Sequence, residues 1–190
     1  MNNTCRLYTD LAWLWPMWGD AADEYAHYCR HVANLIAQHA MHPARTLLDI
    51  GCGGGKNVFN LKATFSVTGV DLSPAMLAQA RLLNPESTFV LGDMRTFRLG
   101  RTFDAVLMDD AVSYMTCLAD FVAALRTASA HLDAGGVLVV TPDVTVETFR
   151  QNSTVATHAT RKGTPDELDV VFVENVYDPD PADEQYETTV

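Results

Sequence analysis

The sequence predicts an α/β fold in which a parallel sheet carries helices on both faces. Apolar stretches of strand length alternate with amphipathic stretches of helix length between residues 20 and 143. The first strand-like stretch runs directly into a cluster of glycines, in "LLDIGCGGGKN". Glycines in that position mark a tight turn or a ligand that approaches the main chain. At 190 residues the chain has the length of one domain with its own core.

Four stretches have the apolar spacing of helices: 20–39, 56–64, 72–83 and 118–132. Asp20 is a candidate N-cap of the first. In "LSPAMLAQARLL", Ser73 is expected to cap the helix and Pro74 to occupy its first position. The fourth helix is expected to close at "DAGG".

Five apolar runs between these helices predict strands buried on both faces: 46–50, 66–71, 87–93, 103–110 and 137–143. After them, "TPDVTVETFRQN" is expected to begin a helix. The stretches "LDVVFVENVYD" and "EQYETTV" predict two further strands, joined by the turn-rich "DPDPAD". We therefore expect a C-terminal antiparallel hairpin.

Composition narrows the class of protein. Hydrophobic residues make up 48% of the chain and charged residues 19%, as in globular proteins. No apolar run approaches the length of a membrane span, and no secretory leader is recognisable. The four cysteines show neither a CxxC pair nor metal-ligand spacing, which indicates reduced thiols in a cytoplasmic protein without a metal site.

The net charge of −11 is concentrated at one end of the chain. Nine of the 24 acidic residues follow Lys162, and no basic residue accompanies them. An acidic chain of this kind does not favour nucleic acid as a partner. The acidic tail is either a solvated hairpin, the interpretation we favour, or an acid-lined substrate mouth.

The spacing of the glycines separates several ligand classes. Ligands of a doubly wound sheet bind at the carboxyl ends of its strands. A dinucleotide fingerprint has the form GxGxxG, but Lys56 stands where the third glycine belongs. This substitution weakens a nicotinamide interpretation without eliminating it. The absence of a GK[ST] ending excludes a P-loop.

Acidic residues at the ends of later strands complete a longer pattern. Asp71 ends the second strand, Gly92-Asp93-Met94 the third and Met108-Asp109-Asp110 the fourth. In order and spacing, "DIGCGGG…VTGVDLS…GDM…FDAVLMDD…GGVLVV" resembles the class I S-adenosylmethionine-dependent methyltransferases over about residues 46–143. The N-terminal "LYTDLAWLW" is similar to small-molecule members of that family. The resemblance implies a Rossmann-like doubly wound sheet ordered 3-2-1-4-5, S-adenosyl-L-methionine as cofactor and methyl transfer to a small molecule.

The resemblance also implies a set of cofactor-binding residues: Tyr8, Asp49, Gly51, Gly53, Gly55, Asp71, Leu72, Asp93, Met94 and Asp109. The three glycines would contact the methionine moiety through their backbone, while Asp49 holds the turn. Asp71 would bind the ribose.

The adenine would pack on Leu72 and be recognised by the Asp93 carboxylate and the Met94 N–H. Tyr8, and with less support Trp13 or Trp15, would belong to an N-terminal lid over the cofactor.

Candidate catalytic residues are Asp110 and Tyr114, near the end of the fourth strand. The sulfonium is already an activated donor, so alignment of the acceptor contributes most of the rate and a base is needed only if the acceptor must lose a proton. Asp109 is alternatively a holder of the cofactor's amino group, and Tyr114 a packing residue of the lid. A lone exposed histidine is the simpler interpretation of His158, and a small filler residue that of Cys52.

By the resemblance, residues 1–143 comprise the lid helix and cofactor-binding core, and residues 144–190 an incomplete C-terminal region carrying the substrate-side hairpin. Family members usually continue beyond this point, so we expect a truncated chain whose fifth strand is an open edge. Such an edge is expected to pair in a homodimer, or else to be covered by the chain's own tail. Two alternatives remain open: an S-adenosylmethionine-binding module without transferase activity and, with less support, a nicotinamide-dependent oxidoreductase.

Overall fold

The computed structural model describes residues 5–161, 167–183 and 185–190. Its 3₁₀ helices (η), α-helices and strands follow in the order η1 (Arg6–Tyr8), η2 (Ala12–Met17), α1 (Ala26–His39), β1 (Thr46–Ile50), α2 (Lys56–Leu61), β2 (Ser66–Asp71), α3 (Pro74–Leu83), β3 (Thr88–Leu91), β4 (Phe103–Met108), η3 (Asp110–Tyr114), α4 (Leu118–Ala130), β5 (Leu132–Val140), β6 (Ser153–Arg161), β7 (Leu168–Tyr177) and β8 (Glu187–Thr189).

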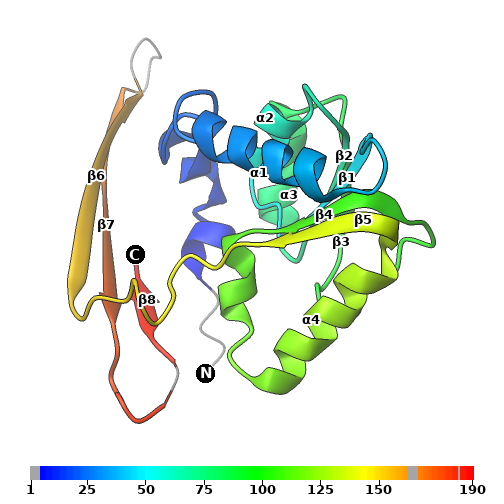
Figure 1. Cartoon of the computed structure of the whole chain (residues 1–190). Coiled ribbons are helices and arrows are strands. Elements are labelled where there is room, and N and C mark those ends of the chain that lie inside the picture. Colours follow the sequence, from blue (N-terminus) through cyan, green and yellow to red (C-terminus); the bar gives the residue numbers. More distant parts are fainter. Residues whose placement is uncertain (1–4, 162–166, 184) are drawn as a thin grey trace.

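The described residues form two sheets, and these confirm the predicted fold class. The first has five parallel strands in the order β3-β2-β1-β4-β5. The second is antiparallel, in the order β6-β7-β8. Figure 1 shows the N-terminal segment, in dark blue, between the antiparallel sheet and the parallel core. The predicted hairpin is the β7–β8 pair, while its partner β6 was not predicted.

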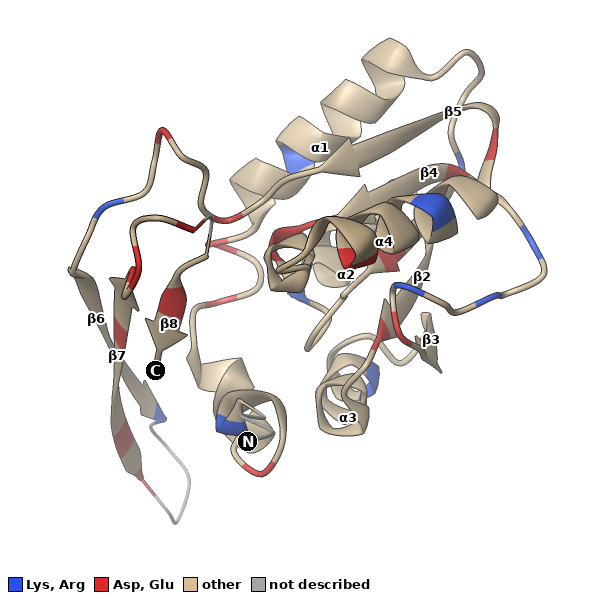
Figure 2. Ribbon diagram, turned by 90° about the horizontal axis from the view of Figure 1, so that it is seen from below, with Lys and Arg blue, Asp and Glu red and all other residues tan. Residues whose placement is uncertain are grey.

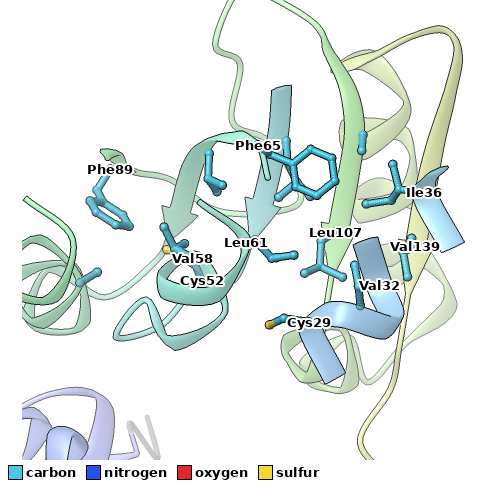
Figure 3. Packing of buried hydrophobic residues seen from close by; sticks show 14 of the residues in the cluster. Cys29, Val32, Ile36, Cys52, Val58, Leu61, Phe65, Phe89, Leu107 and Val139 are labelled. Carbon is cyan, nitrogen blue, oxygen red and sulfur yellow. The ribbon is translucent and has the colours of Figure 1, made fainter. Parts of the chain in front are cut away.

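Alternation along β1 and β4 divides the core into two layers. Leu47 and Leu107 lie in the layer under α1, α2 and α3, whereas Leu48 and Val106 lie in the layer that α4 covers. Figure 3 shows the first layer, with α1 packing over β4 and β5. Side chains this deeply buried contribute about 1.5–3 kcal/mol each to stability. The strands are apolar on both faces because helices cover both.

The first helix starts later than predicted. Asp20 accepts hydrogen bonds from the main-chain N–H groups of Ala22, at 2.8 Å, and Asp23, at 3.0 Å. It therefore caps a separate turn before α1, which begins at Ala26. α2 likewise ends at Leu61, earlier than the predicted Thr64.

Two predictions around β5 are wrong. The stretch "DAGG" does not close α4 as a turn but lies inside β5, which begins at Leu132 with a register shift against β4. Residues 141–152 form turns rather than a helix. Thr148 accepts from the Thr145 N–H at 2.8 Å, and such side-chain bonds compete with helical ones in a segment rich in β-branched residues.

The acidic residues of the C-terminal region are mostly exposed. Figure 2 shows in red that they lie on and around β7 and β8. This agrees with a solvated hairpin. Asp166 and Glu184 also belong to the nine acidic residues after Lys162, but they lie outside the described residues. None of the described helices combines the length and apolar composition needed to cross a membrane.

Candidate active site

The glycine turn between β1 and α2 lies where the carboxyl ends of the strands meet. The Gly51 and Cys52 N–H groups donate to the Val70 carbonyl at the end of β2, at 2.7 and 3.0 Å. Gly51 has a φ of +79°, and a Cβ there would lie 2.3 Å from the Ala111 Cβ. Only glycine fits such a backbone and contact. The segment after β4 therefore packs directly on the turn.

Asp71 ties the end of β2 to the glycine turn. One carboxylate oxygen accepts from the Gly53 N–H at 2.8 Å, and the other accepts from the Ser73 N–H at 2.8 Å. Each oxygen keeps a further lone pair, so the carboxylate can still accept from a ligand. Burial raises the pKa of Asp71 above its ordinary value, and the hydrogen bonds from these main-chain donors offset only part of that shift.

Asp49 does not hold the turn in the way the sequence suggested. It is completely buried, and neither of its oxygens accepts a hydrogen bond from any residue that the structure describes. Burial, with the charges of Asp109 and Asp71, raises its pKa well above the ordinary range. A buried carboxyl without donors is costly, so its place beside the turn indicates a missing donor.

Asp109 forms the centre of a hydrogen-bond network. It accepts from Tyr28 Oη, Thr141 Oγ1 and Asn57 Nδ2, each at 2.7 Å. These donors come from α1, the end of β5 and the first turn of α2. Sequence reasoning missed all three, although Asn57 is a polar residue of α2 that is buried next to the apolar Val58. The network fixes Asp109 next to the glycine turn.

The predicted adenine contacts are at the ends of β2 and β3. Leu72 is 67% exposed. The Met94 side chain reaches the turn, with its Cε 3.6 Å from where a Gly51 Cβ would lie. Both Asp93 oxygens accept from Arg95, at 2.6–3.2 Å, and this contact lowers the Asp93 pKa. Arg95 also pairs with Asp120 at 2.9 Å.

The N-terminal lid, residues 5–20, covers the turn. Ser73 Oγ donates to the Tyr8 carbonyl, and the hydroxyls of Tyr8 and Tyr114 are 2.7 Å apart. The Trp15 indole packs on Gly54 so closely that a Cβ there would lie 2.1 Å from Trp15 Cδ1. Trp13 is 47% exposed. Of the two tryptophans the sequence left open, Trp15 is therefore the one against the turn.

A cavity of about 320 Å³ opens beside Asp109. It is lined by Glu24, Tyr25, Tyr28, Asp109, Asp110, Thr141, Pro142 and Asp143. The lining holds four carboxylates and no basic side chain. Desolvation by the surrounding protein, followed by the charges of Asp109 and Asp143, raises the pKa of Asp110 to about 7, although its side chain reaches the surface. Glu24 and Asp143 were not predicted: Glu24 lies before the first strand, and Asp143, although it ends the predicted fifth strand, was not singled out as a site residue.

Three other side chains that the sequence singled out differ in their burial. Tyr114 is 59% exposed. His158 is exposed on β6 and lies 3.6 Å from Asp169, as a solvated histidine does. Burial raises the pKa of the Cys52 thiol, in agreement with its interpretation as filler. In the described part of the chain, no group of three or more His, Cys, Asp or Glu side chains has the arrangement of a metal site.

The chain is similar in sequence to known methyltransferases. Residues 47–136 match the family model described as a methyltransferase domain. The chain is 36% identical over 164 residues to dTDP-3-amino-3,4,6-trideoxy-alpha-D-glucopyranose N,N-dimethyltransferase of Streptomyces venezuelae, covering 78% of this chain and 69% of that protein.

Solved structures agree in both fold and sequence. DesVI of Streptomyces venezuelae superposes with a TM-score of 0.75 at 29% identity, covering 100% of this chain and 82% of that one. CalS10 with bound S-adenosylmethionine, an amino pentose methyltransferase from Micromonospora echinaspora, gives a TM-score of 0.73 at 30% identity, covering 95% and 79%. The motif register, the strand order and these relatives agree: the chain belongs to the class I S-adenosylmethionine-dependent methyltransferases that act on small molecules.

Proposed function

We propose that the chain transfers a methyl group to the amino nitrogen of a small molecule, with nucleotide-linked amino sugars as the acceptor class. The acidic cavity is the observation that carries this proposal, because four carboxylates without a basic residue favour a cationic group. An amine is an ammonium ion near neutral pH. The names of the similar N,N-dimethyltransferase and amino pentose methyltransferase point to the same acceptor.

The residues of the glycine turn fit the family's cofactor. The turn presents bare main chain, and the buried Asp49 carboxyl has no donor among the described residues. Gly51, Gly53 and Gly55 would lie against the methionine moiety, and Asp71 would bind the ribose hydroxyls. When bound, S-adenosylmethionine supplies a methyl group on a positively charged sulfur that leaves as a neutral thioether.

Leu72, Met94 and Asp93 would contact the adenine, with Asp93 shared between the ligand and Arg95. Tyr8 would contact the cofactor from the lid, and Asp109 its amino group or that of the acceptor. The Tyr8–Tyr114 hydroxyl pair would close the site towards solvent.

Asp110 is the residue we assign to proton transfer. An ammonium nitrogen has no lone pair, so it must lose a proton before it can accept a methyl group. Asp110 lines the cavity, and its pKa of about 7 suits a base that works near neutral pH. The proton passes from the ammonium to the Asp110 carboxylate, and solvent removes it afterwards.

The test is product analysis. Incubation with S-adenosylmethionine and a dTDP-linked amino sugar should give N-methylated and then N,N-dimethylated sugar, identified by mass spectrometry and NMR. Asp110→Asn should bind S-adenosylhomocysteine normally and form product slowly. Methylation of a carboxylate or hydroxyl acceptor, with no reaction at the amine, would contradict the proposal.

We further propose a cytoplasmic location and a homodimer, with no role in nucleic-acid binding. The four free cysteines suit a reducing compartment. Among the described residues β5 pairs on one side only, with β4, which leaves an edge that a second copy can use. The net charge of −11 opposes binding to phosphate backbones.

A further inference from the structure

The indole nitrogen of Trp15 is buried without an acceptor. Trp15 Nε1 makes no hydrogen bond to any residue within the described ranges. It would lie 2.4 Å from a Cβ on Gly54, so the N–H is against the main chain of the glycine turn. A buried donor of this kind normally has a partner. Its position indicates an acceptor that belongs at the turn.

Lys56 holds Trp15 in this position. It is the first residue of α2 and only 5% exposed. Its ammonium donates to the Trp18 carbonyl and lies 5.0 Å from the centre of the Trp15 ring and 5.3 Å from that of Tyr25. The Asn60 amide, one turn further along α2, donates to the Ala21 carbonyl at 2.6 Å. The first turns of α2 thus fasten the end of the lid.

The place of Lys56 is not explained by helix stability. The helix dipole disfavours a cation in the first turn, and burial opposes the charge. Burial lowers the Lys56 pKa to about 8, although the nearby carboxylates of Glu24 and Asp20 partly restore it. The contacts that stabilise the buried ammonium are with the Trp18 carbonyl and the faces of two aromatic rings.

The Asp49 carboxyl is a second buried group near the glycine turn that lacks a hydrogen-bond partner among the described residues. This fully buried carboxyl lacks a donor, whereas Trp15 Nε1 lacks an acceptor, within the residues described. A ligand that satisfies both must carry a donor and an acceptor. An α-amino acid group, with its ammonium and carboxylate on one carbon, has this chemistry.

We propose that the Trp15 indole N–H binds the carboxylate of the cofactor's amino-acid portion, and that Lys56 is the positioning residue that holds Trp15 over the turn. The proposal rests on the cofactor assigned above but not on the identity of the acceptor. Trp15 is therefore the lid residue that contacts the amino-acid end of the ligand, although Tyr8 has the stronger support from the family resemblance.

Two ligands separate this role from general packing. S-adenosylhomocysteine carries the amino-acid group, whereas methylthioadenosine lacks it and shares the rest. Calorimetric titration of both into the wild type, Trp15→Phe and Lys56→Met should show about a tenfold loss of S-adenosylhomocysteine affinity in each variant, as expected for one hydrogen bond to a charged group. Methylthioadenosine affinity should be unchanged, which also shows that the variants are folded.

The double variant should bind S-adenosylhomocysteine no more weakly than either single variant, because both changes remove the same contact. Lys62→Met is the matched control, since Lys62 caps the other end of α2 and pairs with Glu86 at 2.7 Å. It should leave both affinities unchanged.

Three results would overturn the proposal. Equal losses for both ligands would mean that Trp15 and Lys56 only support the fold of the lid. Tighter S-adenosylhomocysteine binding by Trp15→Ala would mean that the Trp15 side chain blocks the ligand site and does not bind the ligand. Failure of the wild type to bind S-adenosylhomocysteine would remove the cofactor itself, whereas binding without amine methylation would count only against the proposed acceptor.

Discussion

Four carboxylates near the glycine turn differ in their surroundings, and those surroundings decide what each can do. Asp71 accepts two main-chain N–H groups and Asp109 three side-chain donors, so both are held in one place. Asp49 has no donor among the described residues. Asp110 lines the cavity and has a pKa of about 7. The residue type is the same in all four, so only the contacts distinguish a structural acid from a base.

The pH dependence of the reaction tests Asp110. Its raised pKa means that the carboxyl is protonated below about pH 7, where it cannot accept a proton from the acceptor. We expect kcat/KM to rise with pH through about 7. Asp110→Asn should lower kcat by about 10²–10⁴-fold and remove this rise.

The control is Glu147→Gln, which changes an exposed acid outside the cavity and should keep both the rate and the profile. A pH–rate profile of Asp110→Asn with the same midpoint as the wild type would rule out Asp110 as the titrating group.

At the level of elements, α3 joins the lid to the cofactor site through its first residues. Ser73 Oγ accepts from the Met76 N–H at 3.1 Å as an N-cap, and the same hydroxyl donates to the Tyr8 carbonyl. One side chain therefore begins the helix and anchors the lid. Because Ser73 lies two residues after Asp71, the end of β2 also lies next to the start of α3 and the lid.

Substitution of Ser73 should separate these two roles. Ser73→Ala removes the cap and should lower the free energy of unfolding by about 0.5–2 kcal/mol, measured by urea denaturation. Ser73→Asp keeps a capping acceptor but loses the donor to Tyr8, so it should keep more of the stability while exposing the lid to proteolysis.

Ser129→Ala, at an exposed position of α4, should change stability by no more than about 0.5 kcal/mol. If Ser73→Ala is as stable as this control, the capping bond contributes nothing measurable.

For the whole molecule, we expect two copies to meet at the open edge of β5. β5 has nine residues and pairs only with β4 among the described strands. Unpaired N–H and C=O groups along such a strand favour pairing with a second copy. We expect light scattering at low micromolar concentration to give a dimer, with an interface of about 1,000 Å² or more.

Hydrogen exchange of the β5 amides also tests whether β5 pairs with a second copy. Protection that increases with protein concentration supports pairing between copies. A monomer with protected β5 amides would instead favour coverage by the chain's own tail.

The sequence by itself determined the parallel sheet, its strand order through the family resemblance, and the glycine turn. These follow from local signals, because apolar runs, a helix cap such as Ser73 and clustered glycines act within a few residues. It did not reveal β6, whose "STVATHATR" lacks the apolar alternation of a half-buried strand and depends on its pairing with β7.

Only the tertiary structure decided which side chains share the site. It placed Trp15 rather than Trp13 on Gly54, gave Asp71 rather than Asp49 the hydrogen bonds of the turn, and joined Glu24 and Asp143 to Asp110 in one cavity. These residues are far apart in the chain, and no periodic pattern links them. Their proximity results from the packing of the lid, α1 and the strand ends against one another, so contacts across the fold, rather than local sequence, determine the chemistry of the site.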